Sequence, residues 1–462
     1  MVDPRRHLLV CFLWSFVLLL SVDGEAEVDV DPDVGRNVTE LIKARGYAVE
    51  THKVTTADRY VLTMYRMPKS YDETQSGSDP AVNKPVVLLQ HGLIDSSFTF
   101  VCNFRKQSLA FILADAGYDV WLANNRGNTW SREHLDYTED DDEFWDFTWE
   151  DMGKYDLPAE IEYVLKRTKR PTLSFVGQSQ GSIQAFAGFS IDQEMAKKVS
   201  YYAALTPVAW TGNMDAKIFN GMAKLHLEKL FKVFDIVEFS PKSKFIQEKL
   251  GGFTCTVLSE LCDSTLSLIM SGPSSSMNTT RLPVYLSQMP AGTSVKNMAH
   301  FAQSIRENTF ASYDYGCDCD RDSDISECSE SECENKKVYG SFDPPAIPIG
   351  KMVYPRTGLY IGGEDSIATE TDIAQLRSAL PSGTIVHELT VDKYTHLDAV
   401  WAADTYEMMY KDLLVQLKKY RGVGYEPNSK SSADSAADAA ETGGEADIVS
   451  EGKIFSFRSQ LD

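Results

Sequence analysis

Hydrophobic positions along the chain follow two patterns, short apolar runs and longer stretches with helical spacing. Runs with the length and composition of buried strands occupy residues 86–90, 118–122, 173–176, 358–361 and 384–391. Apolar residues with helical spacing occupy residues 108–116, 156–166, 182–189 and 404–420. Because these strands and helices alternate, the pattern predicts an α/β fold with a mostly parallel sheet that is flanked by helices.

This alternation is interrupted between residues 208 and 348, where helical spacing dominates and no clear strand run occurs. Helices are expected there at residues 215–237, 243–250, 255–270 and 294–308. The simplest organisation is one α/β domain, made of residues 27–207 and 349–426, with residues 208–348 inserted into it. Residues 427–462 are rich in Ser, Ala, Gly and acidic residues, which predicts a disordered tail.

The N-terminus has the pattern of a secretory signal peptide over residues 1–26. Basic residues at 5–7 precede an apolar run at 8–20, and small or polar residues follow at 21–26. The apolar run is shorter than the roughly 20 residues that a membrane-spanning helix needs. We therefore expect a cleaved signal and entry into the secretory pathway, with an uncleaved anchor as the alternative. No other segment is apolar enough to span a membrane, so none is expected in the mature chain.

Charge and cysteine content narrow the possible partners. The formal net charge of −22 argues against nucleic acid, because binding to phosphates needs a basic patch. Of the eight cysteines, Cys11 lies in the predicted signal, so an odd number remains and at least one is free or bonded to another chain. The patterns at Asn37 and Asn278 are acceptor sites for N-glycosylation in a secreted protein.

Four cysteines lie in an acidic loop over residues 312–339, within the inserted segment. They are Cys317, Cys319, Cys328 and Cys333. Their spacing matches no zinc-binding pattern, and an oxidising compartment favours two disulfides instead. Weak calcium binding by the carboxylates is the alternative, although nothing resembles an EF-hand loop. No metal or cofactor is expected.

The segment Gly177-Gln178-Ser179-Gln180-Gly181 carries the chemistry-bearing motif. It matches the G-x-S-x-G nucleophile elbow, and it lies between a predicted strand and a predicted helix. On such an elbow the chain doubles back, so that larger side chains at the two glycines would collide. The unpaired N–H groups at the start of the helix favour developing negative charge. We therefore expect Ser179 to be a nucleophile; a surface turn is the alternative.

A serine hydroxyl needs a base and an orienting carboxylate. His396 follows the last predicted strand, at the sheet edge where such folds place their chemistry, and it is favoured over His387 within that strand. Asp365, after the strand at 358–361, is the leading acid, with Glu364, Asp392 and Asp398 as rivals. Capping of the following helix is the alternative role for Asp365.

The second part of an esterase site is the oxyanion hole. One donor is expected from the residue after the nucleophile, the backbone N–H of Gln180. The other should come from the loop after an earlier strand, where His91-Gly92-Leu93 follows the run at 86–90. The backbone N–H of Leu93 is therefore the second expected donor.

Several further motifs resemble the acid lipase family of gastric and lysosomal lipases. They are LQHGL at 89–93, LAFILADAGYDVWLANNRG at 109–127, NTWS at 128–131, FWDF at 144–147, MGKYDLPA at 152–159, MPAGTS at 289–294 and YTHLD at 394–398. The similarity extends over residues 38–420. It departs from the family at Gln178, where His is common, and at Thr395, where Asn is common.

This resemblance implies an α/β-hydrolase fold in which residues 208–348 form a cap and lid. It implies hydrolysis of neutral-lipid esters, triacylglycerols or sterol esters, at a lipid–water interface by Ser179, Asp365 and His396. It also places the protein outside the cell or in the lysosomal lumen, and suggests a cap disulfide between Cys255 and Cys262. The alternatives are a carboxylesterase acting on retinyl, wax or other esters, and a non-catalytic lipid-binding protein on the same fold.

Overall fold

A largely parallel sheet forms the centre of the computed structural model, which describes residues 31–224, 237–239, 274–319 and 325–425. Its strands are β1 (Glu50–Thr55), β2 (Tyr60–Met67), β3 (Val86–Gln90), β4 (Asp119–Leu122), β5 (Glu133–His134), β6 (Leu173–Gln178), β7 (Val199–Leu205), β10 (Thr357–Gly362) and β11 (Ile385–Val391). The strand order is β1-β2-β4-β3-β6-β7-β10-β11, and β5 pairs with β2. Strand β2 is antiparallel to β1, β4 and β5, whereas the pairs from β4 to β11 are parallel. The predicted α/β fold is confirmed.

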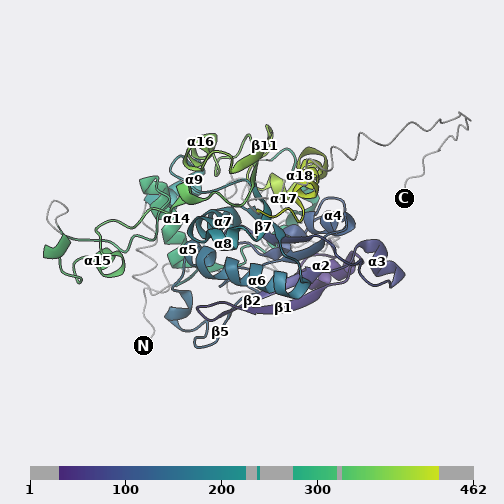
Figure 1. Ribbon diagram of the computed structural model, residues 1–462, viewed down its shortest axis with the longest axis horizontal. Helices are drawn as coiled ribbons and strands as arrows, with labels where there is room; N and C mark the ends of the chain where they lie inside the picture. Colours follow the sequence, from purple (N-terminus) through teal and green to yellow (C-terminus); the bar gives the residue numbers. More distant parts are fainter. Residues whose placement is uncertain (1–30, 225–236, 240–273, 320–324, 426–462) are drawn as a thin grey trace, which may run out of the picture.

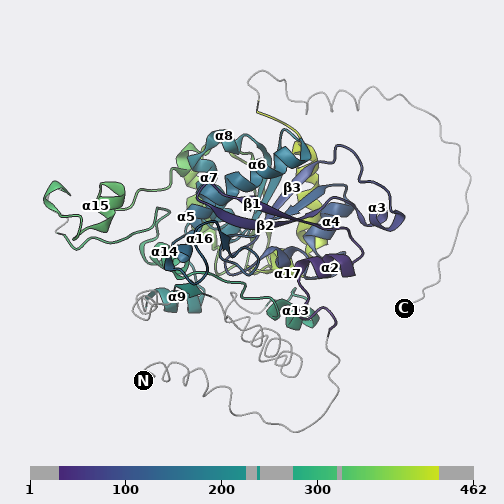
Figure 2. The same ribbon diagram turned by 90° about the horizontal axis from the view of Figure 1, so that it is seen from below.

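Helices cover both faces of this sheet (Figures 1 and 2). The residues of α2 (Val38–Ala44), α4 (Leu109–Asp115), α17 (Asp398–Trp401) and α18 (Lys411–Tyr420) belong to one hydrophobic core. Those of α6 (Leu157–Thr168), α7 (Gln180–Ile191), α8 (Gln193–Ala196) and α16 (Glu370–Ala379) belong to a second. The short helices α3 (Tyr71–Ser76) and α5 (Trp149–Asp151) lie at the periphery and beside α7, respectively.

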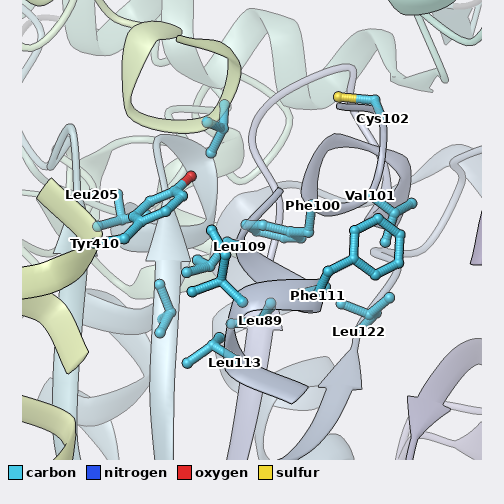
Figure 3. Close-up of a cluster of buried hydrophobic side chains, with 14 of the residues drawn as sticks. Leu89, Phe100, Val101, Cys102, Leu109, Phe111, Leu113, Leu122, Leu205 and Tyr410 are labelled. Carbon is cyan, nitrogen blue, oxygen red and sulfur yellow. The ribbon is translucent and has the colours of Figure 1, made fainter. Parts of the chain in front are cut away.

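Alternate side chains of each buried strand point into the two cores, because successive residues of a strand face opposite sides of the sheet. In β3, Val87 and Leu89 contribute to the core with α4, and Val86 and Leu88 to the core with α7. Figure 3 shows Leu89 beside residues of the loop and helix that follow β3. All four are almost fully buried. A strand that is buried on both faces reads as a continuous apolar run, which is why the sequence predicts β3 so directly.

Within the described residues, the longest regular elements of the segment between β7 and β10 are helices. It contains α9 (Lys217–Lys224), α13 (Leu282–Leu286), α14 (Val295–Glu307) and α15 (Glu334–Tyr339). Helix α14 confirms the helix predicted at 294–308, and the side chain of Ser294 caps it. The sequence shows no clear strand run in this segment, yet β8 (Glu238–Phe239) pairs there with β9 (Thr293–Ser294). Two-residue strands are too short for a periodic pattern. The helices expected at 243–250 and 255–270 lie outside the described residues.

The acidic loop forms an arm that extends from the body and carries α15 (Figures 1 and 2). Disulfides join Cys317 to Cys333 and Cys319 to Cys328, which confirms the expected pair of bonds. Cys102 is a free, buried thiol, which is one of the two outcomes that the odd cysteine count allowed.

Several predictions fall partly or wholly outside the described residues. Cys255, Cys262, the signal peptide at 1–26 and the tail at 427–462 are not described. The division into residues 27–207, 208–348 and 349–426 stays a prediction. Within the described residues, no helix combines the length and hydropathy required to cross a membrane.

Candidate active site

Ser179 occupies a sharp turn between β6 and α7. Its backbone has φ 52° and ψ −115°, a conformation that L-residues rarely adopt. A Cβ on Gly177 would lie 2.5 Å from the carbonyl oxygen of Gly181, so a side chain there would collide with the first turn of the helix. The G-x-S-x-G pattern therefore forms the strand-to-helix elbow that the sequence predicts, and the elbow exposes the serine at the carboxyl edge of the sheet.

His396 contacts both Ser179 and Asp365. Its Nε2 lies 2.7 Å from Ser179 Oγ, and its Nδ1 lies 2.8 Å from Asp365 Oδ2. A carboxylate can only accept, so Nδ1 carries the hydrogen and Nε2 is left to accept a proton from the serine hydroxyl. His396 and Asp365 are buried, being 3% and 7% exposed, whereas Ser179 is half-buried. The structure thus brings together the three residues that the sequence predicts.

Asp365 has a second set of contacts that holds its carboxylate in place. Its Oδ1 accepts hydrogen bonds from the backbone N–H of Ile367 at 2.8 Å and of Ala368 at 2.9 Å. The following helix, α16, is capped by Thr369 rather than by Asp365. The alternative role of Asp365 as the cap of that helix is therefore excluded, and its free oxygen faces the imidazole.

The rival residues lie elsewhere or have other partners. Glu364 and Asp392 are exposed. Asp398 accepts from the N–H of Thr395 at 2.7 Å and from the hydroxyl of Ser274. His387 pairs through Nε2 with Asp412 at 2.6 Å. The hydrogen-bonded path from Ser179 runs through His396 to Asp365 and includes none of these rivals.

The loop after β3 passes directly over the nucleophile elbow. A Cβ on Gly92 would lie 2.5 Å from Gln178 Oε1 and 3.2 Å from Ser179 Cβ, so the loop approaches this closely because residue 92 is glycine. Across the part of the chain that the structure describes, the N–H groups of Leu93 and Gln180 donate to no other protein group. Both are therefore available to a ligand beside Ser179.

Hydrogen bonds of the His91 side chain hold this loop in place. Its Nδ1–H donates to the carbonyl of Gly92 at 2.8 Å, and its Nε2 accepts from the backbone N–H of Asn125 at 3.1 Å. Burial lowers the pKa of His91 to about 4, although the bond to the Gly92 carbonyl opposes that shift. His91 therefore stays neutral at pH 5 and above, and supports the loop without adding charge to the site.

The pocket at Ser179 is mostly apolar. Its lining includes the elbow, the loop after β3 and two residues that follow β10 and β11, Ile367 and Leu397. The segment between β7 and β10 contributes the remaining apolar side chains, which are Val208, Met214, Phe219, Met289, Phe301 and Ile305. An apolar lining with a few polar groups at one end suits a ligand that is largely hydrocarbon.

Two polar residues near the elbow are not predicted from the sequence. Asp95 lines the pocket, is almost fully buried, and accepts from the N–H of Ser96 at 2.7 Å. Burial raises its pKa to about 7. Asn297, on α14, donates to the side chain of Gln180. The position of Asp95 two residues after Leu93 could have drawn attention to it, whereas no local pattern marks Asn297.

The two asparagines of the glycosylation patterns are half-buried and hydrogen-bonded. Asn37 caps α2, and its Oδ1 accepts from the N–H of Glu40 at 3.0 Å. Asn278 donates through Nδ2 to Gln107 Oε1 at 3.1 Å. Their modification stays a prediction.

Comparison with known proteins places the chain in a family. Residues 85–403 match the model of the alpha/beta hydrolase fold, and residues 38–104 match that of a partial alpha/beta-hydrolase lipase region. The chain is 37% identical to gastric triacylglycerol lipase from Homo sapiens, over 84% of this chain and 92% of that protein.

Two further relatives show a similar level of identity. Lysosomal acid lipase/cholesteryl ester hydrolase from Homo sapiens is 36% identical over 90% of this chain and 98% of its own length. Lipase member K from Mus musculus is 34% identical over 87% of this chain and 96% of its own length.

The fold and these matches define a serine ester hydrolase. The chain belongs to the acid lipase family of gastric and lysosomal lipases, within the α/β-hydrolase superfamily.

Proposed function

We propose that this protein is a lipase that hydrolyses neutral-lipid esters, triacylglycerols or sterol esters, through Ser179, His396 and Asp365. The observation that carries the proposal is the continuous hydrogen-bonded path from Ser179 Oγ through the imidazole of His396 to Asp365. A buried acid–base–nucleophile path of this kind activates a hydroxyl that is otherwise a poor nucleophile at neutral pH.

In the first half of the reaction, Ser179 Oγ attacks the ester carbonyl while Nε2 of His396 takes the hydroxyl proton. Negative charge develops on the carbonyl oxygen, where the N–H groups of Leu93 and Gln180 stabilise it. Asp365 stabilises the imidazolium that forms. His396 then donates its Nε2 proton to the departing alcohol oxygen, which leaves an acyl ester on Ser179.

In the second half, a water molecule replaces the alcohol. Nε2 of His396 takes a proton from the water as its oxygen attacks the acyl ester. The second tetrahedral intermediate collapses, its proton returns to Ser179 Oγ, and a fatty acid is released. The alcohol and the acid together account for the ester and one water.

The substrate class is supported by two observations. The pocket beside Ser179 is lined mainly by aliphatic and aromatic side chains, which favours an acyl chain over a polar substrate. The relatives are named for triacylglycerol and cholesteryl ester hydrolysis. Activity on retinyl, wax or other esters is the second possibility, because such substrates share a long apolar chain. Entry into the secretory pathway is supported by the N-terminal pattern and by the two disulfides of the arm.

A fluorophosphonate probe tests the nucleophile. We expect the wild-type protein to label and Ser179→Ala to remain unlabelled and inactive on p-nitrophenyl butyrate, triolein and cholesteryl oleate. Ser190→Ala is a matched control, because Ser190 is a buried serine of α7, the helix that follows Ser179, and its hydroxyl donates to the carbonyl of Phe186. It should label fully. An unlabelled wild-type protein would favour a non-catalytic lipid-binding role, and a labelled Ser179→Ala variant would place the nucleophile elsewhere.

A further inference from the structure

We propose that Asn297 is a positioning residue for the oxyanion hole, because its side chain holds Gln180 in place. This inference rests on the proposed function, in which the backbone N–H of Gln180 is one of the two oxyanion donors. Asn297 lies in the first turn of α14, in the segment between β7 and β10, whereas Gln180 is the first residue of α7.

The side-chain amide of Asn297 joins three separate parts of the chain. Its Nδ2 donates to Gln180 Oε1 at 2.7 Å and to Thr293 Oγ1 at 3.0 Å. Its Oδ1 accepts from the backbone N–H of Trp149 at 2.7 Å. Asn297 is completely buried, so these bonds form in a low dielectric and do not compete with water.

The hydrogen bond from Asn297 is the stronger tether of the Gln180 side chain. The other end of that side chain, Nε2, faces Met152 Sδ at 3.5 Å, and a thioether is a weak acceptor. The backbone of Gln180 follows Ser179, whose φ of 52° is strained. A strained turn keeps its geometry only where its surroundings hold it, and the Asn297 amide supplies such a hold one residue from the nucleophile.

The helix that carries Asn297 also lines the pocket. Phe301 and Ile305, further along α14, lie in the lining beside Ser179. Figures 1 and 2 both place α14 next to α5, which begins at Trp149. One helix therefore lines the pocket and also holds the residue that carries one of the proposed oxyanion donors. Any movement of α14 away from the pocket would break the hydrogen bond between Asn297 and Gln180. The oxyanion hole therefore keeps its geometry only while α14 packs against the pocket.

Kinetics of Asn297→Ala on p-nitrophenyl butyrate test this role. Loss of a complete oxyanion donor lowers kcat by roughly a hundredfold or more, so loss of its support should lower kcat by about tenfold, with KM changed less than about twofold. Gln180→Met breaks the same bond from the other side and keeps both the backbone N–H and the side-chain length. It should lower kcat to a similar extent, and it remains informative if Asn297→Ala fails to fold.

The double variant Asn297→Ala/Gln180→Met identifies the path of the effect. If Asn297 acts through Gln180, the double variant should be no more than about threefold slower than either single variant. Asn335→Ala is the matched control: Asn335 is also completely buried and makes three side-chain hydrogen bonds, but it lies in the arm. It should lower the melting temperature and leave kcat unchanged.

Three outcomes would overturn the positioning role. They are an unchanged kcat in Asn297→Ala, an unchanged kcat in Gln180→Met, and a double variant whose fold-loss of kcat equals the product of the two single losses. These are distinct from failure of the proposed function, which would appear as activity retained by Ser179→Ala.

Discussion

The buried carboxyl of Asp95 makes a quantitative prediction about stability and pH. Asp95 is 2% exposed, and burial raises its pKa from an ordinary value of 3.8 to about 7, against the opposing effect of hydrogen bonds from Ser96 and Thr99. A group whose pKa is higher in the folded state binds its proton more tightly there. Its contribution to stability is complete below about pH 4 and is lost as the pH rises through 7.

The size of this effect follows from the two pKa values. At about 1.4 kcal/mol for each pH unit between 3.8 and 7, ionisation of Asp95 lowers the free energy of unfolding by about 4 kcal/mol at alkaline pH. Between pH 4.5 and 7.5 the change is about 3 kcal/mol, because part of the loss has already occurred at pH 4.5. Asp95→Asn has almost the same shape and cannot ionise, so it should escape this loss.

Urea unfolding of the wild-type protein and Asp95→Asn at pH 4.5, 5.5, 6.5 and 7.5 measures the effect. We expect the variant to gain about 3 kcal/mol relative to the wild type across this range. Other buried carboxyls with raised pKa values, such as Asp156 at about 6, are present in both proteins and cancel in the difference. Asp79→Asn is the control at an exposed position, and its free energy of unfolding should differ from that of the wild type by the same amount at every pH. A difference between Asp95→Asn and the wild type that does not change with pH would refute the reasoning.

Two further predictions concern packing around the elbow and a buried ion pair. Gly181→Ala should lower kcat at least about a hundredfold, because its Cβ would lie 2.5 Å from the carbonyl oxygen of Gln90 and push away the loop after β3, which carries Leu93. Gly221→Ala should keep full activity, because no atom of the described residues outside its own helix lies within 4 Å of its Cβ. A wild-type kcat in Gly181→Ala would contradict this account. Arg126→Ala should lower the free energy of unfolding by roughly 3–5 kcal/mol at pH 7.5, because Arg126 Nη2 pairs with the fully buried Asp156 at 2.6 Å. The loss should be smaller at pH 4.5, where Asp156 can be protonated; an equal loss at both pH values in urea unfolding would argue against an unpaired buried charge.

The parts of the site that depend on local sequence could be predicted. The elbow needs glycines two residues before and after Ser179, and a strand and a helix adjoin it directly, so the pattern and its context are contiguous. Asp365 and His396 could be proposed because each follows a predicted strand, and parallel strands present their carboxyl ends at one edge of the sheet. Their mutual distances could not be predicted, because those depend on the order and register in which β6, β7, β10 and β11 lie side by side in the sheet.

Contacts between distant segments escaped prediction for a related reason. Asn297 and Gln180 are separated by 117 residues. Gln180 belongs to the elbow motif, but Asn297 lies in an ordinary helical stretch without a motif, so nothing local indicates that the two side chains meet. The two-residue strands β8 and β9 are likewise too short to leave a periodic pattern. Asp95 reads as one more polar residue in a loop, because its pKa depends on the apolar groups that tertiary packing places around it.

The sequence by itself therefore determined the α/β fold, the strand-to-helix elbow at Ser179, the strand ends that carry Asp365 and His396, and the family to which the chain belongs. These properties depend on the local order of side chains and on periodicity, and both can be recognised from residues that are neighbours in the sequence. Tertiary structure alone decided that His396 lies within hydrogen-bonding distance of both partners, that Gly92 brings the loop after β3 against Ser179, and that α14 holds Gln180. Those relations depend on how the chain folds back on itself, because distances between remote residues follow from strand order and packing rather than from neighbouring residues.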